Sequence, residues 1–352
     1  MSKKNICMIF GGVSNEHDVS LRSVTTLLTN IDKEKYNVYP VGITKDGRWY
    51  LYTGDVADIV TGEWEKGCVY PAFITPNTDF RGLTVIDNGI TKQIGIDCVF
   101  PMLHGKNGED GTIQGLLALC GLPFVGCGHT SSSLTMDKAF TKLIVESQGI
   151  RQADYVILKS EKKKYDKGLI VKAEEKFGYP MFVKPCNSGS SVGVYKANCR
   201  AELERGIESA LNEDSKLLIE EAVDGAELEC AVLRSDGKYY TEVGEILPDA
   251  DFYTYDDKYN NSVVNTTAYP DISDELKSRL TETAVKIFDL LDCRGLSRVD
   301  FFADKKTGEI VFNEINTIPG FTSISMYPIL MEKLGIKLSE LIDKLIETGL
   351  GN

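Results

Sequence analysis

Two acidic residues near the C-terminus are spaced so that they would face each other across a hairpin. Residues 297–303 and 310–316 alternate in polarity as strands do, and a short turn joins them. Pairing these strands brings four polar residues to one face: Arg298, Asp300, Glu314 and Asn316. The opposite face carries Val299, Phe301, Val311 and Ile315. Opposed carboxylates repel unless a cation lies between them, and Mg²⁺ prefers oxygen ligands of this kind. The pattern predicts a Mg²⁺ site, with Arg298 in reach of a phosphate, unless the hairpin face is simply solvated.

A second segment has the features of a phosphate-binding loop. An apolar strand ends at Lys184-Pro185, and residues 186–193 are mostly small, which leaves backbone amides accessible to phosphate oxygens. Lys184 supplies a fixed cation, and Lys138, on a predicted helix, is another candidate. The loop matches neither the Walker A motif nor GxGxxG after a first strand. Alone, such a loop is more often an ordinary turn, and such a lysine a surface residue. Together with the acidic hairpin, the loop favours nucleotide phosphates.

The first part of the chain alternates strands and helices, which is typical of a parallel sheet. The predicted strands are 6–10, 36–43 and 96–103, and the predicted helices are 18–28 and 112–119. Residues 53–93 interrupt this alternation with scattered Gly, Pro, Asn, Asp and Thr, and we interpret them as an insertion of poorly determined structure.

The remaining elements predict two further domains. A helix is expected from the serine run at 130–133 to about Gln148, with a Gly149 stop, and a small mixed sheet with two helices follows it. Beyond Gly225 we expect strands 228–234 and 239–246, a long polar and aromatic loop at 248–268, a helix at 273–291 and the hairpin. The predicted domains are 1–128, 129–223 and 224–352.

Composition excludes several classes of protein. The chain has 352 residues, of which 42% are apolar and 26% charged, and this is ordinary globular usage. A net charge of −13 makes nucleic acid an unlikely partner. No apolar stretch reaches the roughly 20 residues of a membrane span, and the short run at 6–10 is not a signal peptide. Nine cysteines without zinc spacing are expected to be reduced thiols of a cytoplasmic protein. Cys186, in the phosphate loop, suggests the hypothesis that alkylation lowers activity.

These residues resemble the D-alanine–D-alanine ligase family of the ATP-grasp superfamily over essentially the whole chain. Six ordered motifs carry the resemblance: Phe10-Gly11-Gly12 with residues 16–20, His104 to Gly111, Met136-Asp137-Lys138, Lys184-Pro185 with residues 189–193, Arg298-Val299-Asp300, and Asn313 to Ser323. HGxxGEDG and NExNTxPGxTS are highly specific, whereas the first Gly-Gly is weak. The resemblance implies a mixed α/β and α+β protein with the three-domain ATP-grasp fold and an N-terminal parallel α/β domain.

The resemblance implies an activity that uses ATP and a divalent cation. ATP would phosphorylate the carboxylate of one D-alanine, and the amine of a second would attack the acylphosphate to give the D-alanyl-D-alanine of peptidoglycan precursors. By similarity, Asp300, Glu314 and Asn316 would hold two Mg²⁺ ions, with Mn²⁺ as a substitute. The implied ATP-binding residues are Lys138, Lys184, Glu220 and Glu227. Relatives commonly form homodimers.

Further residues are implied to bind or activate the amino acids. Arg298 and the Gly320 amide would stabilise the oxyanion, Glu16 would bind the first ammonium group, and His104 would position the first substrate. Ser325 would bind the second carboxylate. The loop at 248–268 resembles a lid that excludes water, with Lys258 near the γ-phosphate and Tyr259 in a network with Ser190 and Glu16. An aromatic loop of this kind can also be a mere surface flap.

The second substrate distinguishes wall biosynthesis from glycopeptide resistance. Tyr259 favours an amine acceptor, and Met326 suits a methyl side chain because D-serine-forming relatives generally place arginine there. The segments 41–44 and 105–108 nevertheless also resemble D-alanine–D-serine ligases, which remain the alternative. Two other classes are a different ATP-grasp ligase, which would lack HGxxGEDG and the Glu16 motif, and a nonenzymatic ATP-binding regulator, which would not need the metal acids.

Overall fold

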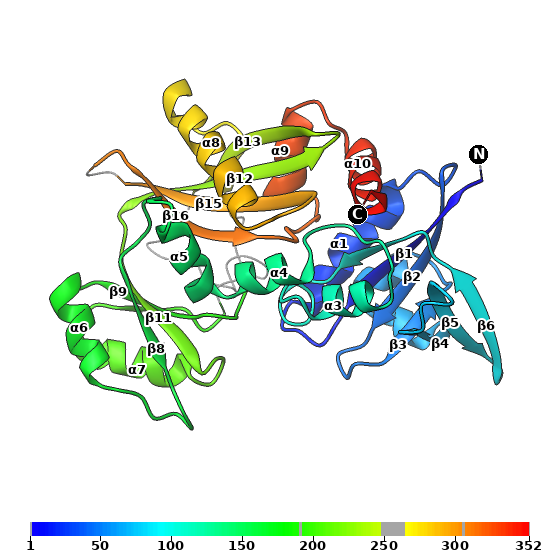
Figure 1. The fold of residues 1–352 in the computed structure, drawn as a ribbon, viewed down its shortest axis with the longest axis horizontal. Coiled ribbons are helices and arrows are strands. Elements are labelled where there is room, and N and C mark those ends of the chain that lie inside the picture. The colour runs from blue at the N-terminus through cyan, green and yellow to red at the C-terminus, as the bar shows by residue number, and fades with distance from the viewer. Residues whose placement is uncertain (1, 190–191, 248–264, 305–306, 352) are drawn as a thin grey trace.

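The computed structural model describes residues 2–189, 192–247, 265–304 and 307–351 (Figure 1). It contains three sheets, which occupy separate regions of the molecule. In the view of Figure 1 the N-terminal sheet lies on the right, the four-stranded sheet at the lower left and the five-stranded sheet above them.

The N-terminal sheet has seven strands in the order β6-β5-β4-β3-β2-β1-β7. Its strands are β1 (Lys4–Gly11), β2 (Tyr36–Ile43), β3 (Trp49–Tyr52), β4 (Val69–Ile74), β5 (Gly82–Asp87), β6 (Ile90–Gly95) and β7 (Cys98–Met102). The accompanying helices are α1 (His17–Asn30), α2 (Ala57–Thr61), η1 (Glu63–Lys66) and α3 (Thr112–Leu119). The predicted parallel pairing is confirmed for β2-β1-β7, whereas β3 to β6 pair antiparallel.

The prediction of poorly determined structure for residues 53–93 was wrong. This segment contributes β4, β5 and β6 to the same sheet and adds the short helices α2 and η1. The side chain of Trp64 is fully buried, with its ring centroid 5.0 Å from that of Phe10 on β1. Such a contact depends on residues distant in sequence, so the local composition did not reveal it.

The predicted single helix over residues 130–148 is in fact two helices, α4 (His129–Met136) and α5 (Lys138–Glu146). Asp137 between them has an extended backbone, and its carboxylate accepts hydrogen bonds from the amides of Ala139 and Phe140 at 3.1 and 3.2 Å. Asp137 is thus the N-cap of α5. The cap places Lys138 in the first turn of that helix.

The central sheet has the order β10-β9-β11-β8 and is wholly antiparallel, so the expectation of a mixed sheet was wrong. Its strands are β8 (Tyr155–Lys159), β9 (Met181–Pro185), β10 (Tyr195–Ala197) and β11 (Lys216–Glu221). The two expected helices are α6 (Gly168–Lys176) and α7 (Arg200–Ala210).

The C-terminal sheet is antiparallel in the order β14-β13-β12-β15-β16. Its strands are β12 (Gly225–Ser235), β13 (Lys238–Leu247), β14 (Asn265–Thr267), β15 (Leu296–Asp304) and β16 (Ile310–Asn316). Its helices are α8 (Asp274–Leu290), α9 (Met326–Lys333) and α10 (Leu338–Leu350). The end of the loop predicted at 248–268 therefore forms strand β14, and most of the loop lies outside the described residues.

The predicted hairpin register is confirmed, with one addition. Asp300 pairs with Glu314 and Arg298 with Asn316, but the register shifts by one residue beyond Asp300, so that Phe301 pairs with Phe312. This β-bulge makes Asn313 the extra residue of β16. It also places Phe312, rather than Val311 as predicted, in the apolar cluster with Phe301.

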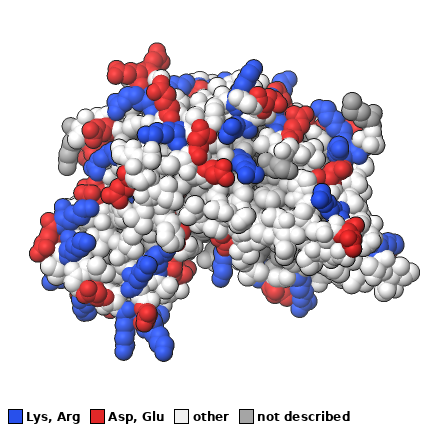
Figure 2. All heavy atoms as spheres, in the orientation of Figure 1, with Lys and Arg blue, Asp and Glu red and all other residues white. Residues whose placement is uncertain are grey.

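The largest apolar core joins the two ends of the chain. Ile6, Met8 and Phe10 of β1 pack in one cluster with Leu341 and Leu345 of α10. Helix α10 contacts α1 and β7, and Figure 1 shows it beside the N-terminal sheet. Among the described residues, no helix is long and apolar enough to cross a membrane. On the face drawn in Figure 2, acidic and basic side chains are interspersed.

Candidate active site

Arg298 is the centre of a buried charge cluster on the C-terminal sheet. Its guanidinium donates two hydrogen bonds to Asp300, at 2.8 Å to Oδ1 and 2.7 Å to Oδ2, and lies 3.1 Å from Oε1 of Glu229. Antiparallel pairing of β12 and β15 places Glu229 directly opposite Asp300. Burial alone would lower the pKa of Arg298, but the charges of Asp300 and Glu229 raise it well above its ordinary value. Arg298 therefore stays charged, and two carboxylates fix its direction.

Glu229 is a site residue that the sequence interpretation missed. It lies two residues beyond Glu227, a predicted ATP-binding residue, on the same face of β12. The signal was an acidic residue recurring at every second position of a predicted strand. Glu227 itself lies opposite Phe302 and is half-buried.

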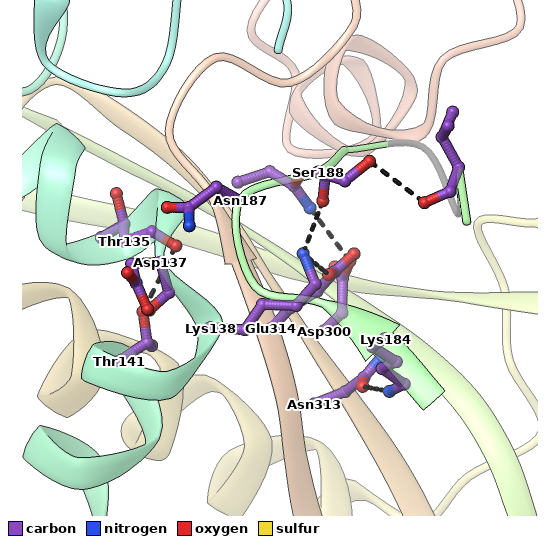
Figure 3. Close-up of polar contacts among 12 residues, drawn as sticks. Thr135, Asp137, Lys138, Thr141, Lys184, Asn187, Ser188, Asp300, Asn313 and Glu314 are labelled. Carbon is purple, nitrogen blue, oxygen red and sulfur yellow. Dashed lines mark hydrogen bonds and ion pairs between the residues drawn. The ribbon is translucent and has the colours of Figure 1, made fainter. Parts of the chain in front are cut away.

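Lys138 connects helix α5 to the hairpin and to the phosphate loop (Figure 3). Its ammonium donates a hydrogen bond to the backbone carbonyl of Ser188 at 2.9 Å and lies 3.2 Å from Oε2 of Glu314. Burial opposes the charge of Lys138, and the Glu314 carboxylate more than offsets this, so the pKa of Lys138 is raised. The two predicted phosphate elements and the acidic hairpin are thus in direct contact.

The three residues predicted to hold metal lie together. Asn316 donates a hydrogen bond from Nδ2 to Oδ2 of Asp300 at 3.1 Å, and Glu314 pairs with Asp300 across the strands. Two carboxylates and an amide oxygen are a donor set that fits a hard divalent cation. In the structure these carboxylates are balanced by Arg298 and Lys138. Among the described residues, no group of three or more His, Cys, Asp and Glu side chains is placed to hold a metal ion.

Lys184 links the central sheet to the hairpin. Its ammonium lies 2.7 Å from Oε2 of Glu220 on β11 and donates a hydrogen bond to Oδ1 of Asn313 at 3.1 Å. The bulge is what makes Asn313 available to it (Figure 3). The other oxygen of Glu220 lies 2.8 Å from Nζ of Lys142 on α5. Burial would raise the pKa of Glu220, but Lys142 and Lys184 lower it to about 2.

Glu16 lies at the N-cap of α1, after the first strand as expected, and is 7% exposed. Its carboxylate is close to two loops. A Cβ built on Gly105 would lie 2.4 Å from Glu16 Oε2, and one built on Gly189 would lie 2.5 Å from the same atom. Glu16 therefore lies against both the HGxxGEDG loop and the phosphate loop. At Gly105 the backbone has a φ of 68°, which favours glycine.

Glu109 is a second carboxylate beside Glu16, and its role was not predicted although it stands in the HGxxGEDG motif. Its oxygens accept hydrogen bonds from the amides of Gly105 at 2.8 Å and Ile318 at 3.1 Å. Burial, and then the charge of Glu16, raise the pKa of Glu109 to about 8. Glu109 thus connects the HGxxGEDG loop to Ile318, and its raised pKa favours the protonated carboxyl near pH 7.

The His104 side chain is hydrogen-bonded on both sides and holds the segment from Ile318 to Phe321 in place. Its Nδ1 lies 3.0 Å from the carbonyl of Ile318, and its Nε2 lies 3.1 Å from Oγ of Ser23, which accepts a hydrogen bond from the Phe321 amide at 3.2 Å. Burial lowers the pKa of His104 to about 4, so the ring is neutral near pH 7. The neutral ring then donates from Nδ1 and accepts from Ser23 at Nε2. These bonds fix residues 318–321, which include Gly320.

Gly320 and Ser325 lie side by side at the start of α9. A Cβ built on Gly320 would lie 2.8 Å from Ser325 Oγ. The Ser325 hydroxyl accepts a hydrogen bond from the Thr322 amide at 3.0 Å. Met326 is 5% exposed and belongs to the core cluster, where its sulfur packs against Gly244 of β13. Ser325 thus lies beside the loop that contains Gly320 and Thr322, whereas the side chain of Met326 points into the core.

A pocket lies between the phosphate loop, the start of α5 and the acidic hairpin. Its lining combines residues of all three parts of the chain: Glu109, Thr135, Met136, Lys138, Ser188, Gly189, Glu314, Ile315, Asn316 and Thr317. Ser190, Lys258 and Tyr259 of the predicted lid network lie outside the described residues.

The surroundings of Cys186 argue against the hypothesis that alkylation of this thiol lowers activity. Its thiol is fully buried, and burial raises its pKa to about 12, with the charge of Asp137 adding to the effect. A buried, protonated thiol is a poor nucleophile. Among the described cysteines, Cys68 and Cys199 are the exposed ones.

Comparison with known proteins agrees with this geometry. Residues 5–127 match the family model described as D-ala D-ala ligase N-terminus, and residues 144–347 match D-ala D-ala ligase C-terminus. A D-alanine–D-alanine ligase of Caldicellulosiruptor bescii is 46% identical over 98% of this chain and 95% of its own length. One of Thermoanaerobacter pseudethanolicus is 47% identical over 98% of this chain and 96% of its own.

Solved structures have the same fold over the whole chain. The VanG D-Ala:D-Ser ligase of Enterococcus faecalis aligns with a TM-score of 0.90 at 39% identity, covering 99% of this chain and 100% of that one. The D-alanine–D-alanine ligase of Coxiella burnetii aligns with a TM-score of 0.87 at 31% identity, covering 100% of this chain and 95% of that one. The chain therefore belongs to the D-alanine–D-alanine ligase family and has its ATP-grasp fold.

Proposed function

We propose that this protein joins two D-alanines to D-alanyl-D-alanine at the expense of ATP, for peptidoglycan precursor synthesis. The observation that carries the proposal is the pocket in which Lys138 and Glu314 meet Ser188 and Gly189, with the Glu16 carboxylate against Gly189. The residue proposed to bind phosphate, Lys138, and the residue proposed to bind an ammonium ion, Glu16, would then lie on either side of the Ser188-Gly189 segment. A ligase that activates an amino acid with ATP needs these two functions side by side.

In the first step, a carboxylate oxygen of one D-alanine attacks the γ-phosphorus of ATP, and ADP leaves. Lys138 and Lys184 bind the phosphates, and Glu16 binds the ammonium group of the amino acid. Asp300, Glu314 and Asn316 would hold Mg²⁺, or Mn²⁺ in its place, and two bound ions would neutralise negative charge on the phosphates. Glu220 and Glu227 would complete the nucleotide site.

In the second step, the amine of the second D-alanine attacks the acyl carbon, and phosphate leaves with its bonding electrons and the bridging oxygen. Negative charge develops on the carbonyl oxygen during the attack. Arg298 and the amide of Gly320 stabilise that charge, and Ser325 binds the carboxylate of the acceptor. Because Asp300 and Glu229 fix Arg298, little reorganisation is needed when the charge forms.

We also propose a lid, most of which lies outside the described residues. The part of residues 248–268 that precedes strand β14 would close over the pocket, with Lys258 near the γ-phosphate and Tyr259 and Ser190 hydrogen-bonded toward Glu16. We also propose the three domains 1–128, 129–223 and 224–352, a homodimer, and a cytoplasmic location.

D-Serine as the acceptor is the second candidate, favoured by the likeness to the VanG D-Ala:D-Ser ligase. The test measures ADP release with D-alanine alone and with D-alanine plus D-serine, and identifies the products by mass. We expect D-alanyl-D-alanine as the main product, with a higher kcat/KM for D-alanine than for D-serine as acceptor. A higher kcat/KM for D-serine would reassign the protein to glycopeptide resistance.

A further inference from the structure

Lys142 is a buried cation that the activity described so far does not use. It lies on α5 one helical turn after Lys138, and its side chain is 2% exposed. Lysine is almost never buried to this extent without a paired charge. Its carbonyl accepts a hydrogen bond from the Gln152 side chain at 2.9 Å, and its ammonium lies 5.4 Å from the centre of the Tyr155 ring.

The partner of Lys142 is Glu220, which it shares with Lys184. The Nζ of Lys142 lies 2.8 Å from Oε1 of Glu220, and the Nζ of Lys184 lies 2.7 Å from Oε2. Glu220 is also 2% exposed, whereas Lys184 is 17% exposed and contacts Asn313 of the hairpin. One carboxylate therefore bridges a fully buried ammonium group and a partly exposed one next to the hairpin.

The charges of these three residues have a simple consequence. A pair of Lys184 and Glu220 alone would be neutral, and the carboxylate would cancel the attraction of Lys184 for an anion. With Lys142 present, the three residues Lys142, Glu220 and Lys184 together carry one net positive charge. Of the two lysines, Lys184 is the one that is partly exposed. Glu221, the next acidic residue on β11, lies 3.2 Å from Arg151 and is therefore balanced separately.

We propose that Lys142 is a positioning residue of the nucleotide site, which balances Glu220 so that Lys184 keeps its charge for the ATP phosphates. The proposal rests on the assignment of Lys184 to ATP under the proposed function. Lys142 also fixes the Glu220 carboxylate, and through it the direction of Lys184, which is held on its other side by Asn313. In a low-dielectric interior, a unit charge of this kind acts over several ångströms.

The test compares the binding of ATP with that of adenosine, each measured by displacement of a fluorescent nucleotide from the full-length protein. Adenosine has no phosphates, so the ratio of the two dissociation constants reports the phosphate-dependent part of affinity. Lys142→Met should reduce the preference for ATP over adenosine about tenfold, the scale of one unit charge in a protein environment. Lys142→Arg keeps the charge and should retain most of the preference.

The double variant Lys142→Met/Glu220→Gln distinguishes charge balance from a merely structural role. It removes both buried charges, leaves Lys184 with its own, and should recover the preference for ATP that Lys142→Met loses. It also leaves no unpaired buried charge, so it remains informative if Lys142→Met does not fold. Lys167→Met is the matched control, because it removes a lysine charge from a side chain that is 76% exposed, and it should change nothing.

Two outcomes would overturn the inference: an unchanged preference in Lys142→Met, or a double variant no better than Lys142→Met. Lys184→Met separates this from a failure of the proposed function. If Lys184→Met lowers the preference for ATP and Lys142→Met does not, the role of Lys142 is refuted alone. If Lys184→Met has no effect on the preference, the assignment of Lys184 to the phosphates is refuted as well.

Discussion

At the scale of single residues, the site depends on carboxylates that hold cations in place. Glu229 makes no predicted contact with substrate, yet it lies 3.1 Å from the guanidinium of Arg298. Glu229→Gln keeps a hydrogen-bond acceptor but removes the charge that helps to fix Arg298. We expect kcat to fall about tenfold, as for other losses of an orienting partner, with little change in the KM for ATP. Steady-state kinetics test this, and an unchanged kcat would mean that Asp300 alone orients Arg298.

The raised pKa of Glu109 leads to a prediction of how the free energy of unfolding changes with pH. Its pKa rises from an ordinary value of 4.5 to about 8, through burial and then through the charge of Glu16. Between these values the unfolded chain loses the proton while the folded protein keeps it, so raising the pH across this window destabilises the fold. Glu16→Gln removes the neighbouring charge and lowers the pKa of Glu109.

Thermal unfolding of the two proteins between pH 5 and pH 8 tests this prediction. The wild-type protein should lose more stability over this range than Glu16→Gln does, because fewer protons are exchanged on unfolding in the variant. A steeper loss of stability in Glu16→Gln would show that Glu109 does not keep its proton next to Glu16.

At the scale of elements, the start of α5 is a capped turn that places Lys138 against Glu314. The Asp137 carboxylate accepts hydrogen bonds from the amides of Ala139 and Phe140 and forms an ion pair with Lys216. Asp137→Ala should lower the free energy of unfolding by about 1–2 kcal/mol, the usual value of a lost N-cap. Asp137→Asn retains the cap and should cost less. Urea unfolding measures both, and equal losses in the two variants would exclude the cap as the cause.

The same elements show what the sequence could reveal. The register of Asp300 with Glu314 follows from strand alternation and a short turn, so it was predictable. The bulge at Asn313 was not predictable. The polar and apolar residues on either side of Asn313 fit a hairpin with the extra residue as well as one without it, so the sequence does not distinguish the two pairings. Asp137 was recognised as part of a motif, but its capping role was masked by the apolar periodicity that continues through it.

At the scale of the whole molecule, the core under the first sheet depends on the last helix. Leu345 of α10 is fully buried in the cluster that includes Ile6 and Met8. Leu345→Ala should lower the free energy of unfolding by about 2–5 kcal/mol and weaken the protection of β1 amides from hydrogen exchange. Leu334→Ala is the control, because Leu334 is 38% exposed. Unchanged exchange in β1 would mean that α10 does not stabilise the N-terminal sheet.

The distant contacts of the molecule explain why the site could be predicted only in part. Motifs identified Glu16, Lys138 and Arg298 because each stands in a short, specific segment. The contacts of Ser23 with Phe321 and of Lys142 with Glu220 join residues far apart in sequence, so no local sequence pattern predicts them. Trp64, which anchors residues 53–93 on Phe10, was missed for the same reason.

We propose that the pocket between these sheets activates a D-alanine carboxylate with ATP and joins it to a second D-alanine. The most direct test supplies ATP, Mg²⁺ and D-alanine labelled with ¹⁸O in its carboxylate, and measures the released phosphate and the dipeptide by mass. We expect one ¹⁸O atom to be transferred to phosphate for each D-alanyl-D-alanine formed, since the bridging oxygen leaves with phosphate. Dipeptide formation without ¹⁸O in phosphate, or no dipeptide at all, would contradict it.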